Sequence, residues 1–186
     1  MLPYYLTNPK CTGAVCSSSK YLAEVITENI GIEQACNIVE IGPGMGAFTK
    51  VILRKKPDLG QFFVVEINTK IANRLHKKFP HLDIALGSAE FLQTMMQERQ
   101  MPFVDVIVSG IPWAFLNQAL QQRILENIHN YLRMSGIFAT FAYILPSAGA
   151  KRFRKRIYSK EMFSEIKKSA IVWNNIPPAF VYYCKK

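Results

Sequence analysis

The stretch VEIGPGMGAFT, residues 39–49, decides the fold of this 186-residue chain. The apolar run over 37–41 predicts a buried strand, and apolar residues at helical spacing follow the stretch. Between strand and helix stand three glycines at alternate positions, Gly42, Gly44 and Gly46. Glycine is required where a turn needs backbone angles that other residues resist, or where a ligand approaches the backbone closely. The stretch therefore predicts a strand, a ligand-binding turn and a helix.

Strand-like and helix-like segments alternate along the rest of the chain. A first helix is expected after the serines at 17–19, which are candidate N-caps, with its end at Gly31. Further helices are expected after Gly46, at 69–78, around 95–96 and at 116–131. The expected strands are short apolar runs at 37–41, 61–65, 82–86, 104–108, 136–143, 170–173 and 180–184. The last two strands should pair antiparallel, because no helix separates them.

This order of elements predicts an α/β fold. We expect a doubly wound, Rossmann-like, seven-stranded sheet that is mostly parallel, with an antiparallel last strand and helices on both faces. The length suits a single domain, divided here into an N-terminal lid or helix segment at 1–30 and a Rossmann-like core at 36–186.

Composition narrows the class of protein. Hydrophobic residues make up 49% of the chain and charged residues 19%, which excludes intrinsic disorder. The longest apolar stretch, 137–145, is well short of the roughly 20 residues that a membrane-spanning helix needs. The first residues lack the pattern of a secretory leader, so a cytoplasmic location is expected. The four scattered cysteines lack the spacing of a zinc site, and no metal is expected.

Positive charge is concentrated in one segment. The chain has a formal net charge of +10, and residues 151–168 hold eight Lys or Arg against two Glu. An anionic partner is expected for this segment. Because Phe153, Ile157 and Tyr158 are interleaved with the charges of Lys151–Arg156, the segment could lie on an anionic membrane surface. The same pattern also suits a helix docked on its own domain, or a solvated face that only keeps the protein soluble.

Two carboxylates flank the glycine turn. Gly42, Gly44 and Ala47 also fit the G-x-G-x-x-G/A spacing of dinucleotide-binding folds, so the turn alone does not identify the ligand. Glu40 favours a ligand with an ammonium group, which a pyrophosphate lacks. Glu66 ends the second strand and is placed to accept hydrogen bonds from ribose hydroxyls, which either ligand would offer. The alternatives are a helix-capping or salt-bridged carboxylate for Glu40 and an exposed strand-end carboxylate for Glu66.

If the glycine turn binds a cofactor that donates a group, the substrate that accepts this group should lie beside the loop that follows the fourth strand. In doubly wound sheets ligands bind beyond the carboxyl ends of the strands, which places SGIPW, residues 109–113, against the bound cofactor. Pro112 stiffens this loop, and Trp113 offers an aromatic face to a cationic or planar group. The alternative for Trp113 is a buried core tryptophan. Tyr143, at the end of the fifth strand, could orient the acceptor, although ordinary packing explains it equally well.

These features together resemble a class I S-adenosylmethionine-dependent methyltransferase. The E-x-G-P-G-x-G turn with an I-P-W loop is similar to enzymes that methylate amino groups, and the chain resembles bacterial phospholipid N-methyltransferases along nearly its whole length. The segments that carry the resemblance are 8–10, 12–15 with the serines after them, 39–49, 109–112, 138–143 and 175–182.

The resemblance implies a cofactor, a set of site residues and an acceptor. The cofactor is S-adenosyl-L-methionine, without a metal. The implied cofactor-binding residues are Ser18, Glu40, Gly42, Gly44, Gly46, Glu66, Ile67, Ser88, Ala89 and Ser109, and the candidate catalytic residues are Ser109, Trp113 and Tyr143. Ser88 stands where the family commonly has an aspartate beside the adenine, and Ser17 stands at a usual proline position. Glu90 is a candidate to replace that aspartate.

The implied reaction is methylation of the head-group amine of a phospholipid or related aminolipid, by an enzyme at the inner face of the membrane. The family typically has a longer N-terminal amphipathic helix, so membrane affinity here would depend on Lys151–Arg156, or the acceptor would be a soluble small-molecule amine. A third alternative is an RNA adenine N6-methyltransferase, suggested by the I-P-W loop and the basic segment. Nucleic acid is the less expected partner, because a separate helical RNA-binding domain is missing.

Overall fold

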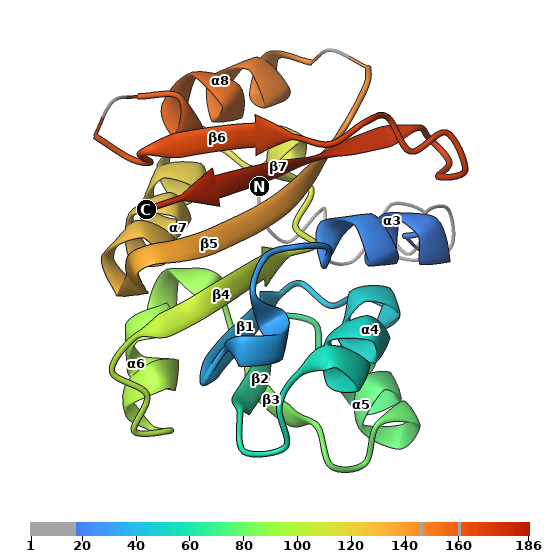
Figure 1. Ribbon diagram of the computed structural model, residues 1–186, viewed down its shortest axis with the longest axis vertical. Helices are drawn as coiled ribbons and strands as arrows, with labels where there is room; N and C mark the ends of the chain where they lie inside the picture. Colours follow the sequence, from blue (N-terminus) through green and yellow to red (C-terminus); the bar gives the residue numbers. More distant parts are fainter. Residues whose placement is uncertain (1–17, 146, 160) are drawn as a thin grey trace.

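The computed structural model of the chain describes residues 18–186, apart from 146 and 160. A seven-stranded sheet in the order β3-β2-β1-β4-β5-β7-β6 forms its centre (Figure 1). The strands from β1 to β5 pair in parallel, while β7 runs antiparallel to both β5 and β6. The strands are β1 Asn37–Ile41, β2 Gln61–Glu66, β3 Asp83–Leu86, β4 Val104–Ser109, β5 Leu132–Tyr143, β6 Glu165–Lys168 and β7 Ala179–Lys185. The expected α/β fold with its antiparallel last strand is confirmed.

Helices cover both faces of the sheet. One face carries α3 Lys20–Ile26, α4 Ala47–Lys55 and α5 Thr69–Lys78, and the other carries α6 Leu92–Gln97, α7 Gln118–Tyr131 and α8 Ala148–Ile157. Short 3₁₀ helices lie at η1 Ile32–Gln34, η2 Ala89–Phe91 and η3 Trp113–Phe115. Alternate residues of β1 serve the two layers: Ile38 packs with α3 and α4, while Val39 packs with α6, α7 and α8. This explains why β1 is buried along its length and shows no alternation of buried and exposed residues.

The boundaries of two predicted elements were wrong. The first helix ends at Ile26, where Thr27 caps it, and Gly31 with φ of 80° belongs to the turn that leads into η1. Ile30 is buried by that turn and not by a helix, so its helical spacing was misleading. The fifth strand begins at Leu132, four residues before the predicted start at 136, and its pairing with β4 shifts register between Val104 and Val106.

The predicted strand at 170–173 was also wrong. Within 170–173, Val172 makes a single bridge to Ala179, and the edge strand is β6 Glu165–Lys168 instead. Edge strands commonly carry charged residues on their solvated face. Because β6 contains Glu165 and Lys167, it has no apolar run by which it could be predicted. The apolar residues at 170–173 belong to the loop between β6 and β7.

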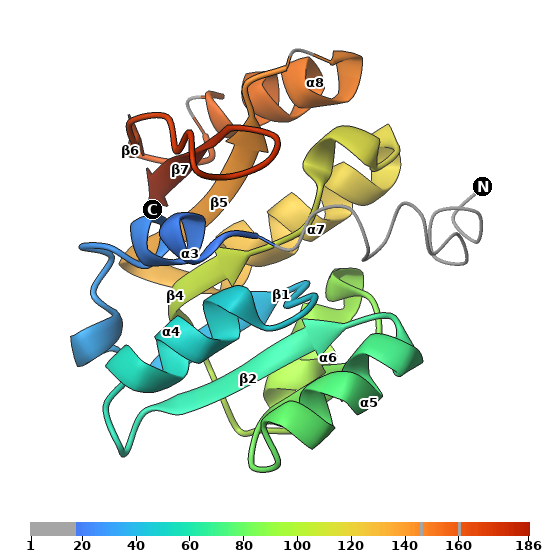
Figure 2. The same cartoon turned by 90° about the vertical axis from the view of Figure 1, so that its right-hand side faces the viewer.

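The carboxyl ends of the parallel strands meet at one edge of the sheet, which we call the carboxyl edge. The arrows of β2 and β4 point toward it on the right of Figure 2. The loop 169–178 also lies there, because Tyr143 at the end of β5 pairs with Ala179 at the start of β7. Within the described residues, the glycine turn and the loop 109–113 therefore lie at the same edge as the loop 169–178. Within the described residues, no helix is long and apolar enough to cross a membrane.

Candidate functional site

The glycine turn is held in backbone angles that favour glycine. Gly42, Gly44 and Gly46 have φ of 72°, 54° and 76°. The amide of Gly42 donates to the carbonyl of Val65 on β2 at 2.9 Å, and Gly46 caps the start of α4. A Cβ on Gly46 would lie 2.6 Å from the ring of Phe79. The turn therefore needs glycine at position 46 both for its angle and for the space that Phe79 fills.

The loop after β4, residues 109–113, contacts the glycine turn through the backbone. We call it the acceptor loop, after the role that the sequence predicts for it. The amide of Gly110 donates to the carbonyl of Ile41 at 2.8 Å, and a Cβ on Gly110 would lie 2.3 Å from the carbonyl oxygen of Gly42. A side chain at position 110 would push the two loops apart. The close approach of Gly42 and Gly110 brings the glycine turn and the loop after β4 together at the carboxyl edge.

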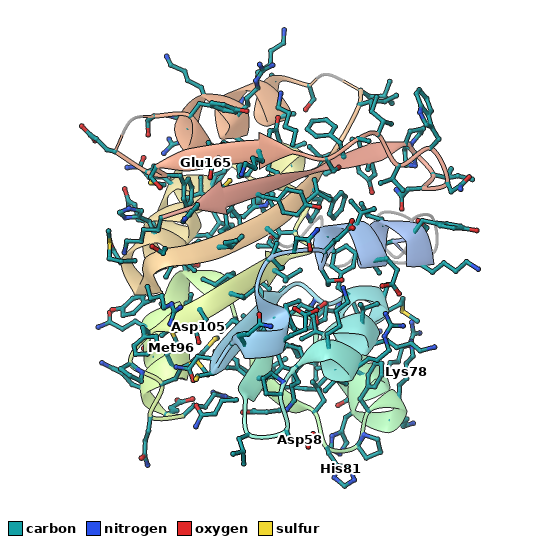
Figure 3. All side chains as sticks on the ribbon, viewed as in Figure 1. Asp58, Lys78, His81, Met96, Asp105 and Glu165 are labelled. Atoms are coloured by element: carbon teal, nitrogen blue, oxygen red, sulfur yellow. The ribbon has the colours of Figure 1, made fainter. Side chains whose placement is uncertain are left out.

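A lysine from α5 supports the turn at its centre. The Nζ atom of Lys78 donates to the carbonyl oxygen of Met45 at 2.8 Å, and Figure 3 labels Lys78 beside α4 and α5. This contact satisfies a carbonyl of the turn and ties the turn to the helix after β2. This role of Lys78 could not be predicted from the sequence, because its partner, the carbonyl oxygen of Met45, lies 33 positions away.

Glu40 is fully buried and only half satisfied. Its Oε2 atom accepts a hydrogen bond of 2.6 Å from the hydroxyl of Thr49 on α4, while its Oε1 atom has no hydrogen-bond partner in the described part of the chain. Burial raises the pKa of the Glu40 carboxyl to about 8, against the lowering effect of the bonds from Thr49. The salt-bridged alternative for Glu40 does not apply among the described residues, whereas the helix-capping alternative does in part, because Glu40 accepts from both the hydroxyl and the backbone amide of Thr49 in the first turn of α4. An ammonium group would supply the missing donor.

Glu66 is held by backbone amides at the end of β2. Its Oε1 atom accepts from the amide of Asn68 at 2.8 Å. Burial raises the pKa of Glu66, and backbone hydrogen bonds from Asn68, Ile67 and Gly44 counteract that rise. The side chain is buried, so Glu66 is not an exposed strand-end carboxylate. Contact with Gly44 places this carboxylate against the glycine turn, and the repulsion between Glu66 and Glu40 contributes to the raised pKa of Glu40.

The expected adenine side lies at the ends of β2 and β3. Ile67 is exposed directly after Glu66, and the amide of Gly87 donates to the Glu66 carbonyl at 2.9 Å. The Ser88 hydroxyl accepts from the amide of Glu90 at 3.4 Å, which makes Ser88 the cap of η2, and Ala89 is buried behind it. The side chains of Ile67 and Ser88 thus border one end of the crevice, while the contacts they would make with an adenine stay predictions.

Glu90 is engaged elsewhere. Its carboxylate forms an ion pair of 2.8 Å with Arg123 on α7, and its carbonyl accepts from Asn127 on the same helix at 2.8 Å. The carboxylate is directed to α7, so in this structure Glu90 acts as a link between η2 and α7. This pair could not be predicted from spacing, because Glu90 and Arg123 are 33 positions apart.

The acceptor loop is built on a buried tryptophan. The indole of Trp113 stacks on Phe153 of α8 with ring centroids 4.7 Å apart, and its Nε1 atom donates to the hydroxyl of Thr140 on β5 at 2.9 Å. Trp113 is therefore the core residue that the sequence left open as an alternative. Ser109 is also buried, and its hydroxyl accepts from the amide of Ile111 at 3.3 Å. Direct contact of Ser109 or Trp113 with an acceptor stays a prediction.

Helix α8 fixes the same loop from outside. A Cβ on Gly149 would lie 1.9 Å from the carbonyl oxygen of Ala114, so α8 packs directly on η3. Gln121 of α7 donates to the carbonyl of Trp113 at 2.9 Å and to that of Gly149 at 3.5 Å. Phe153 and Ile157 point into the core, which leaves Lys151, Arg152 and Lys155 on the outer surface of the helix. The apolar side of α8 is thus used by its own domain.

Tyr143 lies at the carboxyl edge on the other face of the sheet. Its ring packs edge-on against Phe141 with centroids 5.4 Å apart, and Phe141 in turn packs edge-on against Phe48 at the start of α4. Tyr143 is half-buried, beside the first turn of the helix that the glycine turn begins. Its role toward an acceptor stays a prediction.

The N-terminal side of the site is tied to the loop 169–178. The amide of Ser19, which caps α3, donates to Oδ1 of Asn175 at 2.9 Å, and Nδ2 of Asn175 donates to the carbonyl of Pro177 at 2.7 Å. Asn175 belongs to the segment 175–182 that carries the family resemblance, but its bond to Ser19 was not predicted. Ser18 comes directly before this contact. Ser17 and the rest of the predicted lid at 1–17 lie outside the described residues.

The arrangement fits a nucleoside joined to an amino acid. The buried Glu40 has one oxygen that could accept from an ammonium group. The glycine turn with its positive φ angles could let a ligand approach the backbone closely. Glu66, held by backbone amides at the end of β2, could accept from a ribose. Within the described residues, no group of three His, Cys, Asp or Glu side chains could hold a metal ion.

Comparison with known proteins gives one family and several relatives. The family "Ribosomal RNA adenine dimethylase" matches residues 15–161 of this chain. The chain is 29% identical to an ornithine lipid N-methyltransferase of Singulisphaera acidiphila over 177 residues, which covers 92% of this chain and 87% of that protein. It is 33% identical over 107 residues to the ribosomal RNA small subunit methyltransferase A of Borreliella burgdorferi, covering 57% of this chain and 36% of that protein.

Solved structures of methyltransferases share the fold. An O-methyltransferase from Bacillus cereus in complex with SAH superposes with a TM-score of 0.69 at 14% identity, covering 93% of this chain and 84% of that chain. The N-methyltransferase NodS from Bradyrhizobium japonicum superposes with a TM-score of 0.61 at 12% identity, covering 89% of this chain and 96% of that chain.

Proposed function

Because the chain belongs to the ribosomal RNA adenine dimethylase family and is an S-adenosylmethionine-dependent methyltransferase, we propose that it methylates the head-group amine of an aminolipid. The observation that carries this proposal is the similarity to an ornithine lipid N-methyltransferase over 92% of this chain and 87% of that relative. The ribosomal RNA methyltransferase of Borreliella burgdorferi, by contrast, is matched over 36% of its length.

Two carboxylates bind the cofactor in this proposal. Glu40 offers its unpaired oxygen to the ammonium group of the methionine part, and Thr49 keeps the other oxygen fixed. Glu66 accepts hydrogen bonds from the ribose, and the glycine turn allows the chain between them to approach the backbone. Ile67, Ser88 and Ala89 border the adenine, and Ser18 closes the crevice from the side of α3.

The cofactor supplies a methyl group that is already activated by its sulfonium. The protein therefore has to hold a neutral amine in line with that methyl group, with reacting atoms about 3 to 3.5 Å apart, and to exclude water. We assign the orientation of the amine to Tyr143, at the end of β5, and the shape of its pocket to Ser109 and the loop after it. Trp113 supports that loop from the core through its contacts with Phe153 and Thr140.

No strong general base is needed for this reaction. An ammonium head group must lose one proton before its nitrogen lone pair can attack, and that proton can pass to solvent before the methyl transfer. The loop after β4 has no charged side chain, so it offers surroundings of low polarity in which the neutral amine is favoured over the ammonium form.

Transfer of a radiolabelled methyl group tests the acceptor class. The protein is incubated with labelled cofactor and, in separate reactions, with detergent-solubilised ornithine lipid, detergent-solubilised phosphatidylethanolamine, free ornithine and ribosomal RNA. We expect label in a lipid extract, with Glu66→Ala as the inactive control and Glu33→Ala, an exposed carboxylate, as the matched active control. Label only in free ornithine, or only in RNA, would refute the aminolipid proposal.

Adenine in RNA is the second candidate acceptor, because the matching family carries that activity in its description. A protein that binds RNA through phosphate contacts shows an affinity that falls steeply with salt concentration. Binding of a ribosomal RNA fragment with a steep salt slope, together with label transfer to adenine, would favour this candidate over the aminolipid.

A further inference from the structure

In the described part of the chain, the loops that follow the strands at the carboxyl edge carry no charged residue. The six loops that start there, after β1, β2, β3, β4, β5 and β6, contain neither Asp, Glu, Lys nor Arg: they are 42–46, 67–68, 87–88, 110–117, 144–147 and 169–178. The loops at the opposite edge differ. They carry charges of both signs, at Glu28, Glu33, Lys56, Asp58, Glu98 and Arg99. Figure 3 labels Asp58 at that opposite edge. The absence of charge is therefore a property of one edge and not of loops in general.

Large apolar side chains project from three of these uncharged loops. Their exposed fractions are 58% for Phe115, 66% for Leu145, 67% for Trp173 and 81% for Ile176. We call these four residues the apolar rim. Single exposed apolar residues are common on soluble proteins, but a group of large ones around a binding crevice marks an interaction surface.

The loops of the apolar rim contact one another. The carbonyl of Ala114, next to Phe115, abuts Gly149 at the start of α8, which follows the loop of Leu145. The amide of Ile144 donates to the carbonyl of Pro178 at 3.1 Å, which joins the loop of Leu145 to the loop of Trp173 and Ile176. Trp173 also borders a groove of about 750 Å³ together with Tyr21 of α3. The backbone contacts thus join the three loops that carry the rim.

Basic residues stand at the border of this surface. Lys20 begins α3, Lys151 lies in the first turns of α8, and Lys168 ends β6 directly before the loop of Trp173, and all three are exposed. Beyond Glu126 the chain has only two acidic residues, Glu161 and Glu165. An apolar, uncharged centre with a basic border is complementary to a bilayer whose head groups are anionic and whose interior is apolar.

We propose that the apolar rim inserts into the interfacial layer of an anionic lipid bilayer, with the crevice opening toward the head groups. Trp173 and Ile176 enter most deeply, because they are the most exposed members. Tryptophan is the side chain most suited to the level of the head groups, where its ring is in apolar surroundings and its N–H in polar ones. The basic border attracts the anionic surface and sets the orientation. This surface rests on the proposed function, since it would bring an aminolipid head group to the crevice without removing the acyl chains from the bilayer.

Fluorescence quenching tests the insertion directly. The chain has two tryptophans, and Trp113 is buried, so quenching by a lipid reports on Trp173. The probes are vesicles of phosphatidylglycerol and phosphatidylcholine brominated in the acyl chains, with pure phosphatidylcholine vesicles for comparison. We expect a blue shift and strong quenching with the anionic vesicles, and loss of both in Trp173→Phe. High salt should weaken binding, because it screens the basic border.

Substitutions test the depth and the place of insertion. Ile176→Ser should lower partitioning into anionic vesicles about tenfold, which is the effect of removing one buried aliphatic side chain from an apolar environment. The matched control is Leu59→Ser: Leu59 is 97% exposed and lies at the opposite edge, between α4 and β2. Absence of quenching by anionic brominated vesicles, or an equal effect of Leu59→Ser, would overturn the proposal.

Methylation in detergent separates this inference from the function. If the aminolipid function is correct, Ile176→Ser methylates a detergent-solubilised aminolipid at the wild-type rate and loses activity only on vesicles. Equal activity of Ile176→Ser on vesicles and in detergent would refute the insertion while leaving the function intact. Insertion without methylation of any aminolipid would support the surface and refute the function.

Discussion

Thr49 holds one oxygen of the Glu40 carboxylate by a buried hydrogen bond of 2.6 Å and leaves the other oxygen without a partner among the described residues. A buried carboxylate in this condition is costly to ionise, and burial raises its pKa to about 8. A ligand that brings an ammonium group to the free oxygen removes the cost. Glu40 and Thr49 therefore leave one carboxylate oxygen unsatisfied, which the proposed function assigns to the ammonium group of the cofactor.

Glu40→Gln is expected to stabilise the ligand-free protein as the pH rises. The folded-state pKa lies above the ordinary value of 4.5, so the carboxyl contributes stability that is complete below about 4.5 and is lost as the pH rises through about 8. The variant avoids that loss, which is on the order of a few kcal/mol. Urea unfolding at pH 5 and pH 9 measures it; an equal difference between variant and wild type at both values would contradict the assignment.

Cofactor binding at pH 7 is expected to release protons. The Glu40 carboxyl is protonated in much of the ligand-free protein at this pH and must ionise to bind an ammonium group, so about one proton leaves on binding. Calorimetry with S-adenosylhomocysteine in buffers of different ionisation enthalpy counts the protons. In Glu40→Gln the release should vanish and the affinity should fall. A proton count near zero in the wild type would speak against the raised pKa.

Glu66→Ala is expected to reduce cofactor affinity about a hundredfold, because two hydrogen bonds from the ribose to a charged acceptor are lost. Calorimetric titration measures the effect, and circular dichroism checks that the fold is retained. Glu33→Ala, on the exposed side of η1, serves as control. Wild-type affinity in Glu66→Ala would remove the ribose assignment.

Gly110→Ala is expected to cost about 2 to 3 kcal/mol of folding stability, because the new Cβ would lie 2.3 Å from the carbonyl oxygen of Gly42. Gly44→Ala meets no atom within 4 Å and strains only a φ of 54°, so about 1 kcal/mol is expected there. Denaturant unfolding compares the two. The reverse order would show that backbone angle, and not the contact of the two loops, dominates.

We expect a triple variant on α8 to bind anionic vesicles more weakly and to keep its cofactor affinity. It combines Lys151→Gln, Arg152→Gln and Lys155→Gln, whose side chains lie on the outer surface of the helix. Each charge near an anionic surface contributes about 1 kcal/mol. Vesicle sedimentation measures the loss. Arg74→Gln with Lys77→Gln on α5 is the comparison for lost charge elsewhere; an unchanged affinity of the α8 variant would leave its charges a role in solubility alone.

The order of strands and helices could be predicted from the sequence, because β1 and β4 are buried on both faces and are correspondingly rich in Ile and Val. The edge strand β6 could not, because Glu165 and Lys167 give it the composition of a loop. The end of α3 was missed for a different reason: Ile30 is buried by a turn, and burial at helical spacing does not require a helix.

The proximity of Glu40 and Glu66 to one another could also be predicted, since Glu40 lies on β1, which leads into the glycine turn, and Glu66 ends the neighbouring strand β2. Their partners could not, because Thr49 and Gly44 act through contacts that spacing does not reveal. The burial of Trp113 depends on Phe153, which lies 40 positions further along the chain. Such a tertiary contact determines whether the Trp113 ring is exposed or buried, and the local sequence around Trp113 does not predict it.

The bond between Ser19 and Asn175 joins residues 156 positions apart. Asn175 lies in the loop between β6 and β7, and β7 is held by pairing with β5 on one side and β6 on the other. Removing the Asn175 amide would therefore take away the acceptor of the Ser19 amide at the start of α3 while leaving the pairing of β7 intact.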